Sequence, residues 1–589
     1  MRVTRRDMFK VGGLAAAGAA GLIAPWGAVN AGTPSLLAKG KMPQVFKATF
    51  KRLDTLAKTT KYDGYGAIDC YNNSANVGLA DIVPGMKTPV MGYQGVVPGR
   101  KISVEQGTRV QMWIHNRLPK SHPTFGTPVS ISTHLHGSAT LPQYDGYASD
   151  TTDWDFKKLY HYPNYQVART LWFHDHGVHF TSQNAYSGLA SQYHMHDPRE
   201  RALLPQGDTY DVGITLSDMM FQANGSQLFD DRSHSGLWGD VILANGAPWP
   251  VMRVQKRIYR FRFLNASISR SYRPTTFPAA PMWMVATDGG LMDKPQQMSS
   301  WRHGSAERYE VLIDFSGFKA GQRIELRNLS NPNNRDYDFT NKIMAFDVVD
   351  DAFDTNDWKA RTIPVGKHPG GTDLTTWIET KADGSKVEHY EPNEVMALKE
   401  TSGLKVRNIR VEHDDVTNAW MLNGLTWEDV KAADFRPVLA NPGVNDTEIW
   451  EIENKSGGWF HPVHIHLIDF KILSRNGKAP FNYELGPKDV VYVGEGEKVR
   501  LLMKFGDSHK PAYLPERTGR YMVHCHNLVH EDHDMMHQFS VGLPAAKNPT
   551  NGRLEIDPTA SAADLNHPIE ADKPCPEAEN DDDHDLGRY

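Results

Sequence analysis

Ten of the 26 histidines stand in four short clusters. The clusters read HLHG (His134, His136), WFHDHG (His174, His176), HPVHIHL (His461, His464, His466) and HCHNLVH (His524, His526, His530). Each cluster contains two histidines separated by one residue, and on a β-strand such residues point to the same face. Four pairs supply eight imidazoles, which is too many for one zinc ion, whereas imidazole is a good ligand for copper. The spacing therefore predicts a site for several copper ions.

Cys525 stands between His524 and His526, so strand alternation turns its thiol away from their imidazoles. A thiolate, two imidazoles and a weak axial thioether make up the ligand set of a blue-copper electron-transfer site. The sequence offers one such set: Cys525, His461, His530 and Met535. One tripeptide would then join two metal sites and carry electrons from one to the other. Zinc-finger and disulfide interpretations need partner cysteines, and none lies nearby in the sequence.

The four motifs, in this order, resemble those of the three-domain multicopper oxidases, or laccase-like enzymes, over roughly residues 45–543. The stretches HCHNLVHEDHDMM, GWFHPVHIHLIDF, YHYPNYQVARTLWFHDHG and HLHGSATLPQYDGY are similar to the group formed by bilirubin oxidases and spore-coat laccases. The resemblance implies an all-β fold of three cupredoxin-like Greek-key β-barrel domains. It also implies four copper ions, with the type 1 copper in the third domain and a trinuclear cluster between the first and third.

The resemblance implies a role for each ligand of the four coppers. Type 1 copper would take His461, Cys525, His530 and the axial Met535. Type 2 copper would take His134 and His464. The type 3 pair would take His136, His174, His176, His466, His524 and His526. In this family, four electrons collected singly at type 1 reduce dioxygen to water at the trinuclear site.

Two carboxylates are candidates for supplying the protons that this reaction consumes. Glu531 directly follows His530, and Asp145 lies nine residues after His136 in YDGY. The resemblance implies that these carboxylates relay protons, because imidazoles held on copper are poor donors. The alternative is that each is a surface or capping residue, which is common for single acidic residues.

The reducing substrate is left open by the sequence. The favoured function is one-electron oxidation of phenols, aromatic amines or tetrapyrroles such as bilirubin. A metallo-oxidase of Cu(I), Fe(II) or Mn(II) is the first alternative, although the 21 methionines are scattered rather than gathered into a segment. A copper-free structural relative in the periplasm is disfavoured because this chain keeps every ligand.

Several further residues near the motifs allow a structural and a functional interpretation. Trp459 could be a platform for an aromatic substrate or a core residue. His533 and His537 are expected to be surface histidines. Structural roles are likewise expected for three more histidines: His179, His194 and His196. Cys70 and Cys575 could form a disulfide or remain thiols.

Alternation of apolar and polar residues, typical of β-strands, occurs in three stretches of similar sequence. The stretches run over residues 102–116, 256–267 and 446–456, and each strand ends at an asparagine: Asn116, Asn265 and Asn454. A second echo is NGAPW (245–249) against NGLTW (423–427). These similarities predict three related β-domains that must position the histidines.

The expected organisation follows from these repeats and from a length of 589 residues. Domains are predicted at 45–204, 209–363 and 401–545, with a linker region at 364–400. The acidic stretch 546–589 is expected to be a disordered tail. Residues 1–31, with Arg5-Arg6 before a short Ala/Gly segment, resemble a twin-arginine signal peptide, and an ordinary secretory signal is the alternative.

The overall charge is close to balanced, with 64 basic and 70 acidic residues and a net charge of -6. No basic stripe favours nucleic acid, and no later apolar run is long enough to span a membrane. The expected partners are dioxygen and a small reducing substrate. We expect an exported monomer, periplasmic or secreted.

Overall fold

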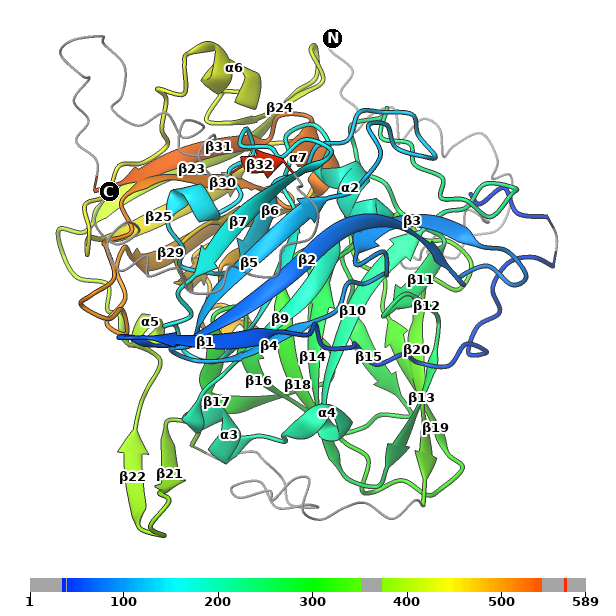
Figure 1. Ribbon diagram of the computed structural model, residues 1–589, viewed down its shortest axis with the longest axis horizontal. Helices are drawn as coiled ribbons and strands as arrows, with labels where there is room; N and C mark the ends of the chain where they lie inside the picture. The colour runs from blue at the N-terminus through cyan, green and yellow to red at the C-terminus, as the bar shows by residue number, and fades with distance from the viewer. Residues whose placement is uncertain (1–33, 39, 351–372, 543–565, 569–589) are drawn as a thin grey trace, which may run out of the picture.

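The computed structural model describes residues 34–38, 40–350 and 373–542 and the short strand 566–568. These residues form β-sheets joined by short helices (Figure 1). The green strands of the middle domain lie below the yellow and orange strands of the C-terminal domain, and the blue and cyan N-terminal strands run beside both. The arrangement confirms the predicted all-β fold of three domains.

The N-terminal domain contains two sheets that enclose a buried cluster of apolar side chains. The first sheet consists of β1 (Thr59–Asp63), β2 (Gly66–Ala80), β3 (Thr88–Tyr93), β5 (Arg109–Asn116) and β7 (Phe156–Tyr162). The second consists of β4 (Ile102–Glu105), β9 (Ala190–His196), β8 (Arg169–Asp175) and β6 (Thr133–His136). The helical turns are η1 (Pro142–Tyr144), α2 (Thr181–Ser187), α3 (Pro198–Leu203) and α4 (Gly207–Tyr210).

The middle domain has a seven-stranded and a four-stranded sheet and carries none of the four histidine clusters. The larger sheet consists of β12 (Ala247–Pro248), β11 (Val241–Ala244), β10 (Asp211–Met219), β14 (Ile258–Asn265), β18 (Arg308–Asp314), β16 (Met282–Thr287) and β17 (Gly290–Met298). The smaller sheet consists of β13 (Val251–Gln255), β20 (Lys342–Val349), β19 (Arg323–Asn328) and β15 (Pro274–Phe277).

The C-terminal domain again pairs two sheets around an apolar cluster. One consists of β24 (Ala419–Leu422), β23 (Lys405–Asp414), β25 (Thr447–Asn454), β29 (Lys498–Lys504) and β27 (Phe470–Arg475). The other consists of β28 (Val490–Val493), β26 (His461–Ile465), β30 (Gly519–Cys525) and β31 (Met536–Val541). Its helices are α6 (Trp427–Ala432), η2 (Asn482–Glu484) and α7 (Leu528–Asp532).

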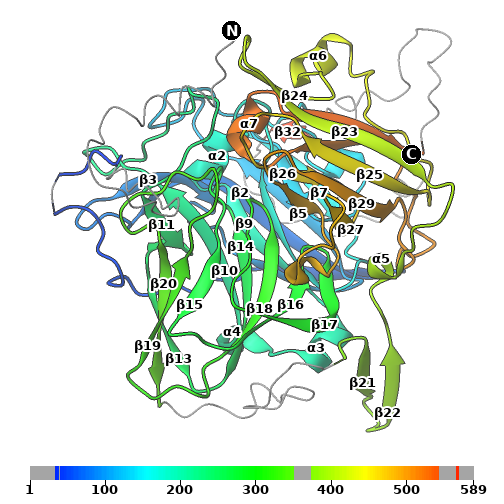
Figure 2. The same cartoon turned by 180° about the vertical axis from the view of Figure 1, so that it is seen from behind.

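The stretch predicted as a linker contains regular structure. A hairpin of β21 (Thr376–Thr380) and β22 (Lys386–Tyr390) precedes the short helix α5 (Glu394–Ala397). The hairpin projects away from the three domains in both views (Figures 1 and 2). Trp377 of β21 is buried in the apolar cluster of the middle domain and stacks on His389, whereas the side chains of β22 alternate between exposed and half-buried.

The three repeated stretches occupy equivalent places in the three domains. They form β5, β14 and β25, each of which pairs in parallel with an earlier strand of its own domain: β2, β10 and β23. Each terminal asparagine accepts a hydrogen bond from the backbone N–H two residues ahead, at 3.0–3.2 Å. This is the local turn that asparagine side chains favour. The predicted relation between the domains is therefore confirmed at the level of single residues.

The C-terminal segment includes one short strand. β32 (Asn566–Pro568) pairs with β7 at the edge of the N-terminal sheet, so part of the stretch expected to be disordered has regular structure. An edge strand presents unpaired backbone groups that an extended segment can satisfy. The predicted signal peptide and Cys575 lie outside the described residues. Among the described residues, no helix is both long and apolar enough to cross a membrane.

Candidate metal centre

Strand pairing brings the histidine clusters together two by two. β6 pairs antiparallel with β8, so that His134 stands opposite His174. β26 pairs antiparallel with β30, so that His464 stands opposite His524. Residues directly opposite in such pairs have side chains close together. Each of the two domains thus presents four imidazoles from one strand pair.

The two sets of four imidazoles face each other across the domain boundary. Nε2 of His134 lies 3.4 Å from Nε2 of His464, although 330 residues separate them in the chain. Nε2 of His524 lies 3.1 Å from Nε2 of His176 and 3.2 Å from Nε2 of His466. The remaining three imidazoles form a second trio, whose ligand atoms all lie within 4.8 Å of one another: His136, His174 and His526.

Hydrogen bonds at Nδ1 fix the orientation of four of the rings. His134 Nδ1 donates to the carbonyl of Asp145 at 2.5 Å, and His174 Nδ1 donates to the carbonyl of Asp175 at 2.7 Å. The other two rings, His464 and His466, donate from Nδ1 to the Asp489 carbonyl and the Asp145 carboxylate. A ring bonded at Nδ1 keeps Nε2 as its free lone pair. In these four rings the free nitrogen faces the other imidazoles.

His136 is turned the other way round. Its Nε2 donates to Oδ1 of Asp489 at 3.2 Å, and its Nδ1 has no hydrogen-bond partner among the described residues. The nitrogen left free on this ring is therefore Nδ1, which belongs to the trio with His174 and His526.

These orphan nitrogens fit metal ions. Nε2 of His174 and of His526 are also buried without a partner in the described part of the chain, and an unmet buried polar atom is costly. Burial lowers the pKa of His174 to about 3 and that of His176 to about 4, so both imidazoles are neutral at pH 7. Neutral imidazoles with converging lone pairs are ready metal ligands.

Glu531 lies against one trio. Its carboxylate stands 2.8 Å from Nδ1 of His524 and 3.5 Å from Nδ1 of His176, and the side chain is buried. Burial opposes ionisation, but the neighbouring His524 and His176 outweigh it and hold the pKa of Glu531 below its ordinary value. The surface alternative considered for Glu531 is therefore wrong.

Asp145 touches two of the imidazoles from the other side. Its Oδ2 accepts from His466 Nδ1 at 2.7 Å, its backbone carbonyl accepts from His134, and its Oδ1 accepts from Thr140 at 3.1 Å. Burial raises the pKa of Asp145 well above its ordinary value. Asp145 is also no surface residue, and its carboxyl and backbone carbonyl together link a ring of the C-terminal domain to one of the N-terminal domain.

Cys525 faces away from these imidazoles, as strand alternation requires. Its Sγ lies 3.4 Å from Nδ1 of His461 and 3.7 Å from Nδ1 of His530, and the two nitrogens are 3.2 Å apart. Helix α7, directly after β30, returns His530 to the thiol side. Burial raises the pKa of Cys525, so a cation is needed to hold the thiolate there.

Met535 and two tryptophans complete the surroundings of Cys525. Met535 is fully buried in the same apolar cluster, and its backbone is bonded both to Cys525 and to His530. Trp420 stacks on the His530 ring at a centroid distance of 3.9 Å. Trp459 is only partly buried and lies 6.0 Å from both the His530 and the Trp420 ring.

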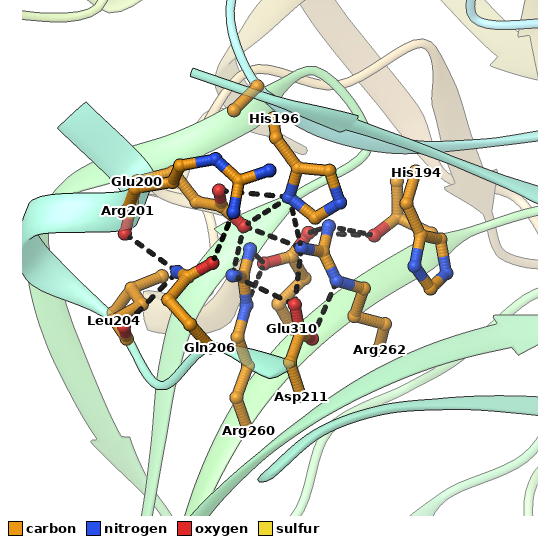
Figure 3. Close-up of polar contacts among 12 residues, drawn as sticks. His194, His196, Glu200, Arg201, Leu204, Gln206, Asp211, Arg260, Arg262 and Glu310 are labelled. Atoms are coloured by element: carbon orange, nitrogen blue, oxygen red, sulfur yellow. Dashed lines mark hydrogen bonds and ion pairs between the residues drawn. The ribbon is translucent and has the colours of Figure 1, made fainter. Parts of the chain in front are cut away.

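The remaining histidines take structural roles, with one correction. His196 bonds Glu200 and Arg262 in a buried charged cluster, and His194 lies beside it, bonded to Gln192 (Figure 3). His537 was expected at the surface, but it is buried on β31. The expectation fails because every residue of β31 is buried, although β31 is the edge strand of its sheet: β30 pairs with one edge, and the backbone of Leu439 and Ala440 bonds the other.

Asp489 is the residue of the site that the sequence did not reveal. Its carbonyl and carboxylate hold His464 and His136. It stands 23 residues after the nearest histidine cluster, in GPKDVVYV, which has no metal-binding spacing. The sequence did contain one indication: Lys488 and Asp489 directly precede an apolar strand. Charged residues in such positions are buried only when they are paired.

Comparison with known proteins agrees with this geometry. Family models described as multicopper oxidase match residues 76–200 and 407–544. The chain is 37% identical to a bilirubin oxidase of Albifimbria verrucaria over 482 residues, 79% of this chain and 73% of that protein. It is 29% identical to a laccase of Bacillus subtilis over 514 residues, 78% of this chain and 91% of that protein. The fold is similar to the McoA multicopper oxidase of Aquifex aeolicus, with a TM-score of 0.68 at 24% identity over 85% of this chain and all of that one.

Proposed function

Because the chain belongs to the multicopper oxidase family, a family of copper-dependent oxidoreductases that use dioxygen, we propose that it oxidises aromatic substrates with four bound copper ions. The substrates would be phenols, aromatic amines or tetrapyrroles of the bilirubin kind. Bound copper supplies one-electron redox chemistry at one site and reduction of dioxygen to water at the other.

We assign the ligands from the groups that the structure brings together. The blue site would use His461, Cys525, His530 and Met535. The type 2 copper would use His134 and His464. The type 3 pair would be divided between the two trios, His136, His174 and His526 on one ion and His176, His466 and His524 on the other.

The alternation along β30 is the observation that carries this proposal. Cys525 touches His461 and His530 on one face, while His524 and His526 contribute to the two trios on the other. A single strand thus connects a site for collecting electrons with a site for using them. Neither half alone would distinguish an oxidase from a simple metal store.

We propose that Glu531 and Asp145 supply protons. Both carboxyls are buried against imidazoles of the centre, within 2.7–2.8 Å of a ring nitrogen. A general acid must lie within hydrogen-bond reach of its partner, directly or through one water. The two carboxyls contact different rings of one trio, Glu531 beside His524 and His176 and Asp145 beside His466.

Aromatic substrates are supported by the partly exposed Trp459. It lies beside His530 and Trp420, at the side of the blue site where an electron would enter. A partly exposed indole offers an apolar stacking surface close to a proposed metal ligand. The 37% identity to a bilirubin oxidase supports the same class.

Oxidation of metal ions is the second candidate, favoured by a group of side chains next to His530. The rings of His234 and His533 stack at 3.5 Å, and Asp231 Oδ2 lies 3.4 Å from His533 Nε2. The neighbouring Ser235 carbonyl accepts from His530 Nε2 at 3.1 Å. Such nitrogen and oxygen donors could hold a divalent cation near the blue site.

Steady-state kinetics on the copper-loaded protein would separate the two candidates. We expect a higher kcat/KM for bilirubin or a phenol than for Fe(II), and unchanged aromatic oxidation in Asp231→Asn. A higher value for Fe(II) that falls selectively in Asp231→Asn would replace the aromatic proposal. In Cys525→Ser we expect the blue absorption and all oxidase activity to disappear. Metal analysis that found zinc and no copper would overturn both candidates.

We also propose that the protein acts outside the cytoplasm, after export of a folded chain. The support is the paired arginines before a short Ala/Gly segment at the N-terminus. Fractionation of cells that express the full chain, with an Arg5→Lys and Arg6→Lys variant as control, would test the route.

A further inference from the structure

The middle domain holds none of the proposed ligands, yet one of its side chains reaches the metal centre. Arg308 begins β18 and is completely buried. Its guanidinium forms a bidentate pair with the carboxylate of Asp489, with Nη1 2.7 Å from Oδ1 and Nη2 bonded to Oδ2. Asp489 Oδ1 in turn accepts from His136 Nε2. The contact chain therefore runs from the middle domain to an imidazole of the N-terminal domain through a carboxylate of the C-terminal domain.

All five guanidinium donors of Arg308 are used. Besides Asp489, Nε donates to the carbonyl of Thr170 at 2.9 Å, Nη1 to that of Ala306 at 3.1 Å and Nη2 to that of Asp288 at 3.2 Å. Thr170 lies on β8, the strand that also carries His174. A planar fork with every donor occupied has one allowed orientation, which lysine cannot reproduce. The position of the Asp489 carboxylate is therefore set from the middle domain.

Gly137, the glycine of the HLHG motif, packs against the same ion pair. A Cβ at Gly137 would stand 2.7 Å from both Arg308 Nη2 and Asp489 Oδ2, and the backbone there has a φ of +88°. The ion pair thus packs directly on the turn that follows His136. A larger residue would separate the two charges or displace the turn.

His136 differs from the neighbouring histidines in which of its ring nitrogens is hydrogen-bonded, and its partner is the carboxylate of the ion pair. The rings of His134, His174, His464 and His466 are bonded at Nδ1, whereas His136 is bonded at Nε2 and presents Nδ1 to its trio. Which ring nitrogen binds a metal is set by the hydrogen bond of the other one.

We propose that Arg308 is a positioning residue of the trinuclear centre, which acts through Asp489 to hold His136 with Nδ1 toward its copper. This inference rests on the ligand assignment in the proposed function. It gives the copper-free middle domain a defined part in assembling the site. Arg308 touches neither dioxygen nor the reducing substrate.

The test compares Arg308→Lys and Arg308→Met with a matched control, Arg262→Lys. Arg262 is equally buried, lies on the neighbouring strand β14 and also bonds Thr170, but its charge partners are Asp211, Glu200 and Glu310 rather than Asp489 (Figure 3). Any general weakening of the interface between the first two domains should appear in all three variants. Loss of ring orientation should appear only at Arg308.

The readouts are copper stoichiometry, the blue absorption band, the near-ultraviolet band of the coupled type 3 pair and the paramagnetic copper signal. We expect both Arg308 variants to keep the blue band but to bind one type 3 copper roughly 10- to 100-fold more weakly. The type 3 band should fall, and a formerly coupled copper should become visible by paramagnetic resonance. Arg262→Lys should retain the coupled pair.

A double variant separates positioning from packing. Arg308→Met leaves the Asp489 charge buried and unpaired, whereas Arg308→Met with Asp489→Asn removes both charges and keeps an amide oxygen for His136 Nε2. We expect the double variant to regain part of the type 3 band. If Arg308→Met yields no folded protein, Arg308→Lys and the double variant give the same comparison.

Unchanged type 3 signals in the Arg308 variants, or equal losses in Arg262→Lys, would overturn the inference. Failure of the parent protein to bind copper or to show a coupled pair would instead overturn the proposed function. The two failures are therefore distinguishable in one set of samples.

Discussion

At the scale of single residues, the four proposed ligands of the blue site are held in two different ways. Cys525 lies close to both imidazole nitrogens, while Met535 is tied to the site by its backbone as well as by packing. This division suits a redox site, because the thiolate and imidazoles hold the ion and the thioether adjusts its potential.

Replacement of Met535 by leucine should raise the potential of the blue copper. A thioether donates weakly to Cu(II) and favours it over Cu(I), so its loss favours the reduced state. A ten- to hundredfold change in relative affinity corresponds to about 60–120 mV for a one-electron couple. A redox titration measures the shift, with the nearby buried Met503→Leu as a control for packing. A lower potential in Met535→Leu would contradict the axial assignment.

Replacement of Glu531 by glutamine should slow the reaction with dioxygen. The amide keeps the shape of the side chain but cannot donate a proton, and general acids typically contribute 10²–10⁴-fold. We expect four coppers, a normal blue band and normal electron uptake, with reoxidation about 100-fold slower in stopped flow. Asp145→Asn should behave similarly, with an added disturbance of the type 2 signal, since Asp145 also holds His134. Reoxidation at the parental rate at every pH would exclude the proton role.

At the scale of elements, one helix of the C-terminal domain caps another in the N-terminal domain. Helix α2 follows Phe180, which offers no capping side chain. Asp532 at the end of α7 accepts from the backbone N–H groups of Thr181 and Ser182 at 3.0 and 2.7 Å, and from the Ser182 hydroxyl. The carboxylate thus supplies across a domain boundary what a local N-cap would supply.

Asp532→Ala should lower the free energy of unfolding by about 2 kcal/mol, because two buried N–H groups lose their acceptor. Asp532→Asn should cost less, since its amide oxygen still accepts one bond. Denaturant titration would measure both. Thr426→Ala, which removes the cap of the exposed helix α6, is the comparison, with an expected loss of about 1 kcal/mol. Equal stability of Asp532→Ala and the parent would show that water replaces this cap.

The sequence predicted those features of the elements that depend only on residues close together in the chain. Alternation placed two histidines on one face of β30 and Cys525 on the other, and each repeated asparagine closes the same turn. The partners of these elements could not be predicted, because they depend on contacts between distant segments. Arg308 and Asp489 are 181 residues apart, and the residues adjacent to each in the sequence do not indicate that the two form an ion pair. His537 was misjudged for the same reason, since its burial depends on distant segments such as Leu439 and Ala440 that cover the edge of β31.

At the scale of the whole molecule, a pH-sensitive contact of His509 links the C-terminal domain to the segment that connects it with the middle domain. His509, in the loop after β29, lies 3.0 Å from Asp507 and 3.5 Å from Glu391 of the connecting segment. Its hydrogen bonds to these carboxylates raise the pKa of His509 from 6.5 to about 10. The protonated ring therefore stabilises the folded state fully below pH 6.5, and this contribution is lost as the pH rises toward 10.

His509→Gln should accordingly be less stable than the parent at pH 6, by about 1 kcal/mol, since the partly exposed contact is screened by solvent. The difference should shrink between pH 6.5 and about 10 and vanish above it. Denaturant titrations of both proteins across this range would show it. His389→Gln removes a histidine paired with Glu379 within the projecting hairpin and serves as the control. A difference that grows with pH would reverse the assigned sign.

The two halves of the metal centre become available at different times during synthesis. Nε2 of His134 meets Nε2 of His464 across 330 residues of chain, and at 5–20 residues per second the later half follows the earlier by tens of seconds. Throughout that delay the four N-terminal histidines would have neither the thiolate of Cys525 nor the opposing imidazoles of β26 and β30 beside them. Imidazole binds zinc as well as copper, although copper(II) stands above zinc in the affinity order. Copper supplied after the ribosome has released the chain would meet the complete set of donors from both domains.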